Sequence, residues 1–246
     1  MKLLVCVSKT PDTTSKIAFT PDGRAFDTSG VQFIMNPYDE WYALVRAIEL
    51  KEQFGGTVTL INVGPAANDV IIRKGLAIGA DDAVRVDLEP NSSLNVAKQI
   101  AAYAEGKGYD MILLGKETID YNGSEIGAMV GEYLGLPFVS FGSHMEVEGN
   151  TATIKRDIDG GEEEVTVETP FVISAAKGMA EQRIPNMRGI MMSKRKPITV
   201  VPPVPFEDPV HVVQYELPPA KGSVHLVDPE NMSELVRLLH EEAKVI

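Results

Sequence analysis

Strand and helix signals alternate through the first two-thirds of the chain. Short apolar runs rich in β-branched residues are followed by segments whose apolar residues recur every three or four positions, as at Trp41, Leu44, Val45 and Ile48. This alternation predicts βαβ units, in which right-handed crossovers build a parallel sheet covered by helices. The expected strands are 3–8, 57–63, 83–87 and 110–115, and the expected helices are 36–56, 67–80, 93–108 and 123–135.

The pattern changes after about residue 137. Residues 144–170 indicate short strands joined by Glu-Gly-Asn and Asp-Gly-Gly turns, and 171–178 indicates a strand that returns to the sheet. From residue 201 the chain is rich in proline, which predicts an extended arm, and a helix with one apolar face ends it. We therefore expect a Rossmann-like α/β fold over 1–200, with a mostly parallel sheet, helices on both faces and a β-hairpin region. Residues 201–246 form the arm and terminal helix, which pack either on this domain or on a partner subunit.

Composition excludes several classes of function. The chain has 23 Lys and Arg against 35 Asp and Glu, a formal charge of −12, which argues against general binding to nucleic acid or anionic membranes. No apolar run is long enough to span a bilayer. The single Cys6 lies in the first expected strand, so it forms no disulfide within the chain, and the N-terminus does not resemble a signal peptide. We expect a protein of the bacterial cytoplasm rather than of the mitochondrial matrix.

The sequence contains few groups suited to catalysis. It has no Gly-x-Gly-x-x-Gly or Walker motif and no nucleophile elbow, and its four histidines are scattered without metal-ligand spacing. We therefore predict no catalytic residues and no metal site. This pattern favours a binder or carrier, and a stand-alone adenine-nucleotide-binding regulator or hydrolase is the alternative from another class.

Topology selects the candidate binding site. Ligands of open α/β sheets bind beyond the carboxyl ends of the strands, which places the turns 36–37, 63–65 and 115–127 at the site. The last turn runs from a buried strand through glycines into a helix, whose N-terminus would favour a phosphate. The alternative is an ordinary polar loop with an Asn or Ser cap.

A basic segment, residues 182–196, contrasts with the acidic chain. It holds five Lys or Arg residues, no acid and three of the ten methionines. A nucleic-acid patch is one interpretation, although the net charge and the lack of interleaved aromatic residues oppose it. A solvated basic loop is another.

Five stretches of the chain together resemble one family. "IKRDIDGGEEEVTVETPFVIS" (154–174) is similar to the signature of the beta subunit of electron-transfer flavoproteins. Four further stretches resemble that family in the same order: the Asn-Pro stretch and helix at 33–52, the Gly-Pro turn and helix at 63–86, the nucleotide loop at 112–120 and the partner-recognition loop at 181–196. The resemblance extends from residue 1 to about 200, with a weaker likeness in the arm.

The resemblance implies a heterodimer with an alpha subunit that holds most of the FAD. Such a pair accepts electrons from acyl-CoA-type dehydrogenases and passes them to a membrane quinone oxidoreductase, without inserting into the membrane itself. The beta subunit holds a structural AMP. By position, the implied AMP contacts are Cys6, Asn36, Pro37, Tyr38, Asp39, Val63, Gly115, Lys116, Glu117, Thr118, Ile119, Asp120, Tyr121, Asn122, Gly123, Ser124, Glu125 and Ile126.

The resemblance also implies which residues bind the partners, and the chain departs from the family at one position of the nucleotide loop. Within the recognition loop, 175–197, Met187 stands where the family inserts an apolar anchor into the dehydrogenase. The accompanying residues are Ile184, Ile190, Arg183 and Arg188, and Asp157 is placed near the partner's flavin. Glu125 stands where the family usually has Gln, and a carboxylate there would repel a phosphate. One branch of the family binds a second FAD at this position and bifurcates electrons, which is the alternative to AMP.

Overall fold

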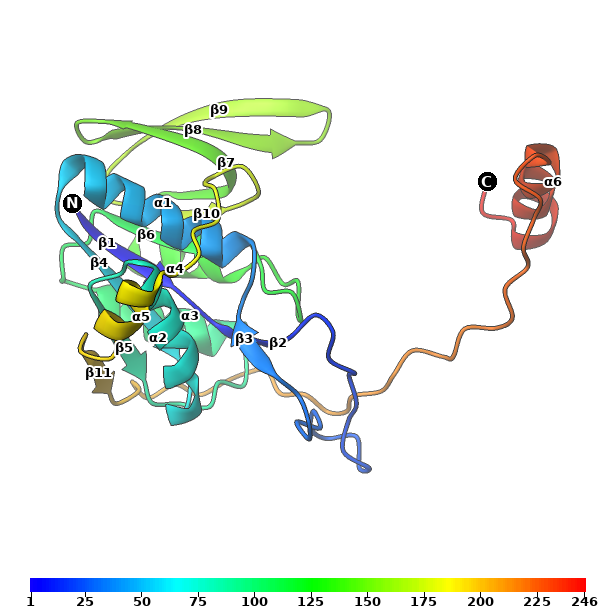
Figure 1. Cartoon of the computed structure of the whole chain (residues 1–246), viewed down its shortest axis with the longest axis horizontal. Helices are drawn as coiled ribbons and strands as arrows, with labels where there is room; N and C mark the ends of the chain where they lie inside the picture. Colours follow the sequence, from blue (N-terminus) through cyan, green and yellow to red (C-terminus); the bar gives the residue numbers. More distant parts are fainter.

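The computed structural model describes residues 1–246, and its centre is a nine-stranded sheet (Figure 1). The strand order is β11-β5-β4-β1-β6-β10-β7-β8-β9, parallel from β11 to β7 and antiparallel beyond. The strands of this sheet are β1 (Lys2–Cys6), β4 (Thr57–Val63), β5 (Asp82–Val86), β6 (Met111–Gly115), β7 (Phe138–Glu148), β8 (Thr151–Ile158), β9 (Gly161–Glu168), β10 (Phe171–Ala175) and β11 (Ile198–Val201).

Helices cover both faces of the sheet, as the alternation predicts. The helices are α1 (Asp39–Phe54), α2 (Asp69–Ile78), α3 (Ser93–Ala104), α4 (Ile126–Leu134), α5 (Met187–Ser193) and α6 (Met232–Arg237), with the 3-10 helix η1 (Ala66–Asn68) and the π-helix η2 (Leu238–Ala243). Helices α1 and α2 pack on one face, and α3 and α4 on the other. Strand β1 shows the cause, because Leu3 and Val5 enter one core while Leu4 and Cys6 enter the other. The expected Rossmann-like fold class is confirmed.

The sheet has its topological switch at β1. From β1 the chain moves to β4 and then β5 on one side, and later crosses to β6 on the other side. Cys6 and Gly115 therefore lie at the carboxyl ends of adjacent strands, and Val63 ends the strand on the opposite side of β1. This crevice is where open α/β sheets hold their ligands.

The hairpin region also agrees with the sequence. Strands β7, β8 and β9 join through tight turns at 149–150 and 159–160, and β10 returns to the sheet between β6 and β7. Four elements were not expected from the sequence: the strands β2 (Lys9–Pro11) and β3 (Phe33–Met35), which form a small antiparallel pair, the edge strand β11, and the helix α5. All are short, so their residue patterns carry little periodic signal.

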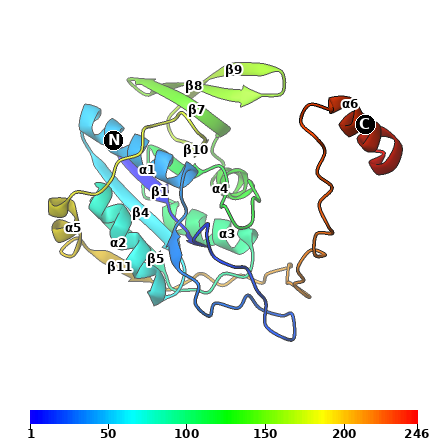
Figure 2. The same ribbon diagram turned by 45° about the vertical axis from the view of Figure 1, so that its right-hand side comes forward.

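The arm begins along the body and then leaves it. The Gln99 side chain pairs with both backbone groups of Val204, the Ser92 hydroxyl donates to Asp208, and the Tyr215 N–H donates to Gly23 O. After Tyr215 the hydrogen bonds of the chain are only local. Figures 1 and 2 both show α6 separated from the sheet. No helix combines the length and apolar character that crossing a membrane requires.

Candidate functional site

Asn36 joins two of the turns that topology selects. Its side chain is fully buried, and Nδ2 donates to the carbonyl of Glu117 at 3.0 Å. The Oδ1 of the same amide accepts the N–H of Ile119, also at 3.0 Å. One side chain therefore satisfies a donor and an acceptor of the loop after β6, and holds that loop against the turn before α1.

Gly115 allows the end of β6 to approach the start of α1. A Cβ placed on Gly115 would lie 2.7 Å from the backbone nitrogen of Glu40 and 2.9 Å from its Cγ. Backbone atoms cannot move aside as a flexible side chain can, so this position requires glycine. The turns at 36–39 and at 115–119 thus form one structural unit.

The unit extends to residue 126, the end of the same loop, and its backbone is strained. Five non-glycine residues have positive φ in the whole chain, and three of them are Tyr38 at 63°, Asn122 at 49° and Ser124 at 52°. Such conformations cost free energy and persist at sites that the surrounding structure holds in place. Here the Asn122 N–H donates to Thr118 O at 2.9 Å, and the Ser124 hydroxyl donates to Glu117 at 3.0 Å.

The electrostatics of the site are mostly acidic. Burial raises the pKa of Asp39 to about 6, although nearby Lys116 opposes the shift. Burial likewise raises the pKa of Glu40 to about 8. Burial also opposes ionisation of Glu117, but hydrogen bonds from Ser124 and Asn122 outweigh it and lower the pKa of that carboxyl. A bound anion would therefore depend on backbone N–H groups more than on cationic side chains.

Those N–H groups are present at the start of α4. The amides of Ile126, Gly127 and Ala128 have no hydrogen-bond partner within the chain, and the side chain of the N-cap residue Glu125 does not bond to them. Free first-turn amides and the helix dipole suit a phosphate. Glu125 is exposed, and its carboxylate lies near Gly123 rather than across the first turn. The residues present thus fit a nucleotide phosphate held by backbone.

The candidate contacts occupy two environments. Cys6, Asn36, Val63 and Gly115 are buried at the strand ends, whereas Tyr38 and Tyr121 are exposed. Burial raises the pKa of the Cys6 thiol far above its ordinary value, and the negative charge of Glu40 raises it further, so the thiol stays protonated and fits a packing role.

Sequence reasoning missed Ser8 and Glu40 as members of the site. Glu40 lies near the start of the expected helix 36–56, where acidic residues are common and usually exposed, yet it is buried next to Ser8 and Gly115. A signal was available, because Glu40 lies one helical turn before Leu44 and therefore on the apolar stripe of α1.

The basic segment 182–196 contains the short helix α5, which hydrogen bonds hold to the body. The Trp41 indole donates to the carbonyl of Arg183 at 3.1 Å, and Arg73 donates to that of Ser193 at 2.6 Å. Lys196 donates to Leu76 O at 2.9 Å and also to Ala80 O. The Asn186 side chain caps α5 by accepting from Gly189 N–H at 2.8 Å.

Within this segment the predicted partner residues differ in exposure. Ile184 is 85% exposed and Met187 is 74% exposed, with Ile190, Met191 and Met192 also exposed beside them. Arg183 is engaged with Glu52 through two contacts of 2.8 and 2.9 Å, so it anchors the segment to α1, whereas Arg188 is exposed. Asp157 is exposed on β8, directly opposite Glu162 of β9.

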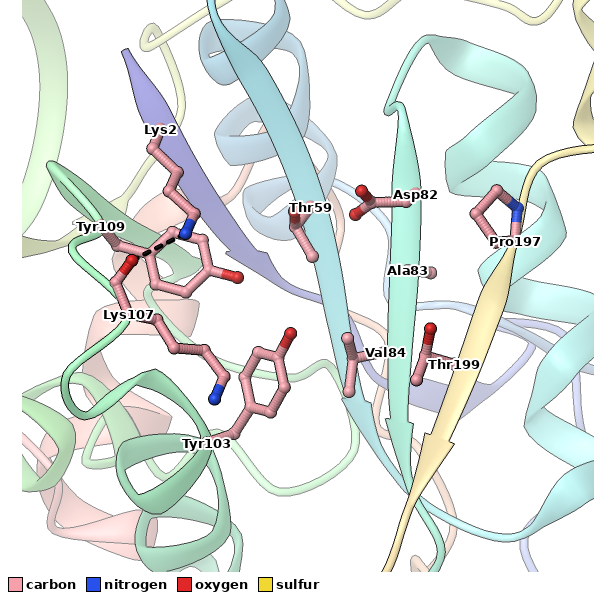
Figure 3. Close-up of a pocket in the computed structure, with 10 residues that line it drawn as sticks. All are labelled: Lys2, Thr59, Asp82, Ala83, Val84, Tyr103, Lys107, Tyr109, Pro197 and Thr199. Carbon is pink, nitrogen blue, oxygen red and sulfur yellow. Dashed lines mark hydrogen bonds between the residues drawn. The ribbon is translucent and has the colours of Figure 1, made fainter.

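A depression in the surface lies apart from the candidate site, at the opposite end of the strands. The depression of about 260 Å³ lies at the amino ends of the strands and is lined by Lys2, Tyr103, Lys107 and Tyr109 among others (Figure 3). Its lysines already contact aromatic rings, Lys2 over Tyr109 at 4.8 Å and Lys107 over Tyr103 at 4.6 Å. No group of His, Cys, Asp and Glu in the chain is arranged to hold a metal ion.

Comparison with known proteins agrees with this geometry. The model of the electron transfer flavoprotein domain family matches residues 24–205. The chain is 33% identical to the electron transfer flavoprotein subunit beta of Bacillus subtilis, with all of both chains covered. It is 37% identical to that of Syntrophomonas wolfei over 91% of this chain and 88% of the relative, and 32% identical to the human protein over 100% and 99%. The chain belongs to the electron transfer flavoprotein family, as a beta subunit that acts in electron transfer.

Proposed function

We propose that this chain forms a heterodimer with an electron transfer flavoprotein alpha subunit. The pair would accept electrons from acyl-CoA-type dehydrogenases and deliver them to a quinone oxidoreductase, in the bacterial cytoplasm. FAD, held mainly by the alpha subunit, supplies the redox chemistry when bound. The residues of this chain would bind the structural nucleotide, orient the flavin-bearing subunit and dock the dehydrogenase. Membership of the family carries the first part of this proposal, and the named relatives are all beta subunits.

We propose that the unit built from 36–39 and 115–126 holds a structural AMP. The observation that carries this proposal is the Asn36 clamp, which fixes the loop after β6 at the topological switch of the sheet. The partnerless amides at the start of α4 would receive the phosphate, and glycine at 115 keeps the strand end close to α1.

A second candidate is the bifurcating branch, with a second FAD in place of AMP. The observation that favours it is the departure at Glu125, which stands where the family usually has Gln. Both candidates are tested by releasing the bound ligands from the purified heterodimer and identifying them by mass spectrometry. We expect one AMP and one FAD per heterodimer. Two FAD and no AMP would overturn the AMP proposal in favour of bifurcation.

We further propose that α5 and its flanks dock to the dehydrogenase. Met187 would insert into an apolar pocket of the partner, with Ile184 and Ile190 around it and Arg188 near acidic groups. Methionine is unbranched and polarizable, so one side chain can fit the pockets of several dehydrogenases. Asp157, exposed on β8, would face the flavin-bearing subunit.

A further inference from the structure

Glu40 is a buried carboxyl group directly beneath the nucleotide unit. It is 6% exposed and is the second residue of α1. Its Oε2 accepts the N–H of Ser8 at 2.8 Å, and its Oε1 accepts the Ser8 hydroxyl at 2.5 Å. Ser8 follows β1, so this contact ties the exit of the central strand to the start of α1.

A continuous hydrogen-bonded path leads from Glu40 to the nucleotide loop. Beyond its two bonds to Glu40, Ser8 accepts the Asn36 N–H on its carbonyl at 3.0 Å. The side chain of Asn36 then holds the backbone of Glu117 and Ile119. Glu40 also touches the loop's origin, since Gly115 packs against its backbone nitrogen and Cγ.

No cation neutralises this carboxyl group. The charged groups that face it are acids, Asp39 from α1 and Asp120 from the nucleotide loop, and the Cys6 thiol faces it from β1. Lys116 and Glu117 face Asp39 rather than Glu40. An ionised Glu40 would therefore place an uncompensated negative charge below the ligand, whereas a protonated Glu40 would not.

We propose that Glu40 is a positioning residue of the nucleotide pocket, which holds the loop through Ser8 and Asn36 and weakens nucleotide binding when its carboxyl group ionises. This inference rests on the proposed binding of AMP at the same pocket. It adds that the affinity depends on a residue that does not itself contact the ligand.

Among the groups at the pocket, Glu40 titrates in a pH range of its own. Burial raises the pKa of Glu40 to about 8, whereas that of Asp39 lies near 6 and that of Tyr121 near 12. The second pKa of a phosphate monoester is about 6. Between pH 7 and 9 the nucleotide is therefore already a dianion, and the carboxyl group expected to lose its proton is that of Glu40.

The experiment is a calorimetric titration of AMP into the full chain at pH 7, 8 and 9, alone and after co-expression with the alpha subunit, in both cases after removal of any nucleotide that copurifies. We expect the Kd of the wild type to rise about fivefold from pH 7 to 9, the result of one pKa unit of coupling between the ionisation of Glu40 and the binding of AMP. Glu40→Gln should bind AMP at pH 7 with the Kd of the wild type, and its Kd should not rise between pH 7 and 9. Ser8→Ala removes a hydrogen bond that favours the carboxylate, so its transition should move to higher pH.

Glu132→Gln is the matched control, because it removes one acid from the exposed end of α4 and should keep the wild-type pH dependence. A flat wild-type profile, or a Glu40→Gln variant that keeps the rise, would overturn the inference while leaving the AMP proposal intact. A wild type that binds no AMP at pH 7 in either form would overturn the AMP proposal, and this inference with it. Circular dichroism at pH 7 and 9 verifies that each variant is folded.

Discussion

Two exposed apolar segments of this chain differ in how they are held. The segment 183–196 includes α5 and is fixed to the body by hydrogen bonds from Trp41, Arg73 and Lys196. The terminal segment 232–246 exposes Met232, Val236 and Ile246, but its ion pairs, such as those of Arg237, are all internal. One segment presents its side chains at a fixed place on the body, whereas the other makes no hydrogen bond or ion pair with the body.

The difference indicates two kinds of partner. A braced apolar patch loses little conformational entropy on binding, which suits repeated, transient docking of dehydrogenases. An arm that becomes ordered on binding spends part of its interaction energy on that ordering but can cover a large surface, which suits a permanent subunit. The comparison therefore supports assigning α5 to the dehydrogenase and the arm to the alpha subunit.

Removal of residues 216–246 should have the largest effect. These residues make no hydrogen bond to the body, so the free energy of unfolding of the body should stay within about 0.5 kcal/mol of the full chain. Heterodimer affinity should fall by about 100-fold or more, because the apolar face of α6 can no longer be buried on the partner. Denaturant unfolding and a binding titration with the alpha subunit measure the two quantities. Unchanged affinity would show that the arm is not the permanent interface.

Gly189→Ala should remove the brace of α5 without changing its exposed side chains. A Cβ at this position would lie 2.3 Å from the carbonyl oxygen of Ala77, so α5 must move away from α2. We expect a loss of about 2 kcal/mol in the free energy of unfolding, as for other overpacked sites, together with slower dehydrogenase-driven flavin reduction. Gly222→Ala is the control, since a Cβ there meets no atom within 4 Å. Wild-type stability and reduction rate in Gly189→Ala would show that bracing does not matter.

Met187→Ala should separate docking from folding. Because the side chain is 74% exposed, the free energy of unfolding should change by no more than about 0.5 kcal/mol. Dehydrogenase-driven flavin reduction at limiting carrier concentration should fall about tenfold, while bound cofactors and the heterodimer are retained. Val70→Ala, which truncates a 77% exposed residue on α2, should leave the reduction rate unchanged. Equal rates in the two variants would exclude Met187 as the anchor.

The body could be predicted from the sequence because its signals are local and repeated. Buried strands such as 111–115 and the apolar stripe of α1 appear directly in the residue pattern. The turns that make up the nucleotide unit followed from strand order alone. Residue patterns did not reveal α5, because seven residues containing Gly189 carry no helical period.

Contacts between distant residues explain the remaining differences. The burial of Glu40 depends on Ser8 and Gly115, which lie 32 and 75 residues away in sequence. The engagement of Arg183 by Glu52 likewise spans 131 residues. A sequence pattern predicts which residues can be buried, but it does not predict which residues distant in the sequence contact them in the fold.

Tyr215→Ala should have the smallest effect and should sharpen the boundary between the docked and the free arm. Tyr215 stacks on Phe19 with ring centroids 5.0 Å apart and planes 15° apart, and its N–H donates to Gly23 O at 2.7 Å. Loss of the ring should cost about 1 kcal/mol of arm docking. Since the preceding anchor is Asp208 on Ser92, the first residue open to proteolysis should move from beyond 215 toward 209.

Limited proteolysis with mass analysis of the fragments measures that position. Val213→Ala, at an 82% exposed residue, should leave it unchanged. An unmoved cleavage site in Tyr215→Ala would mean that the inner arm is held by its backbone and by Gln99 rather than by the aromatic stack.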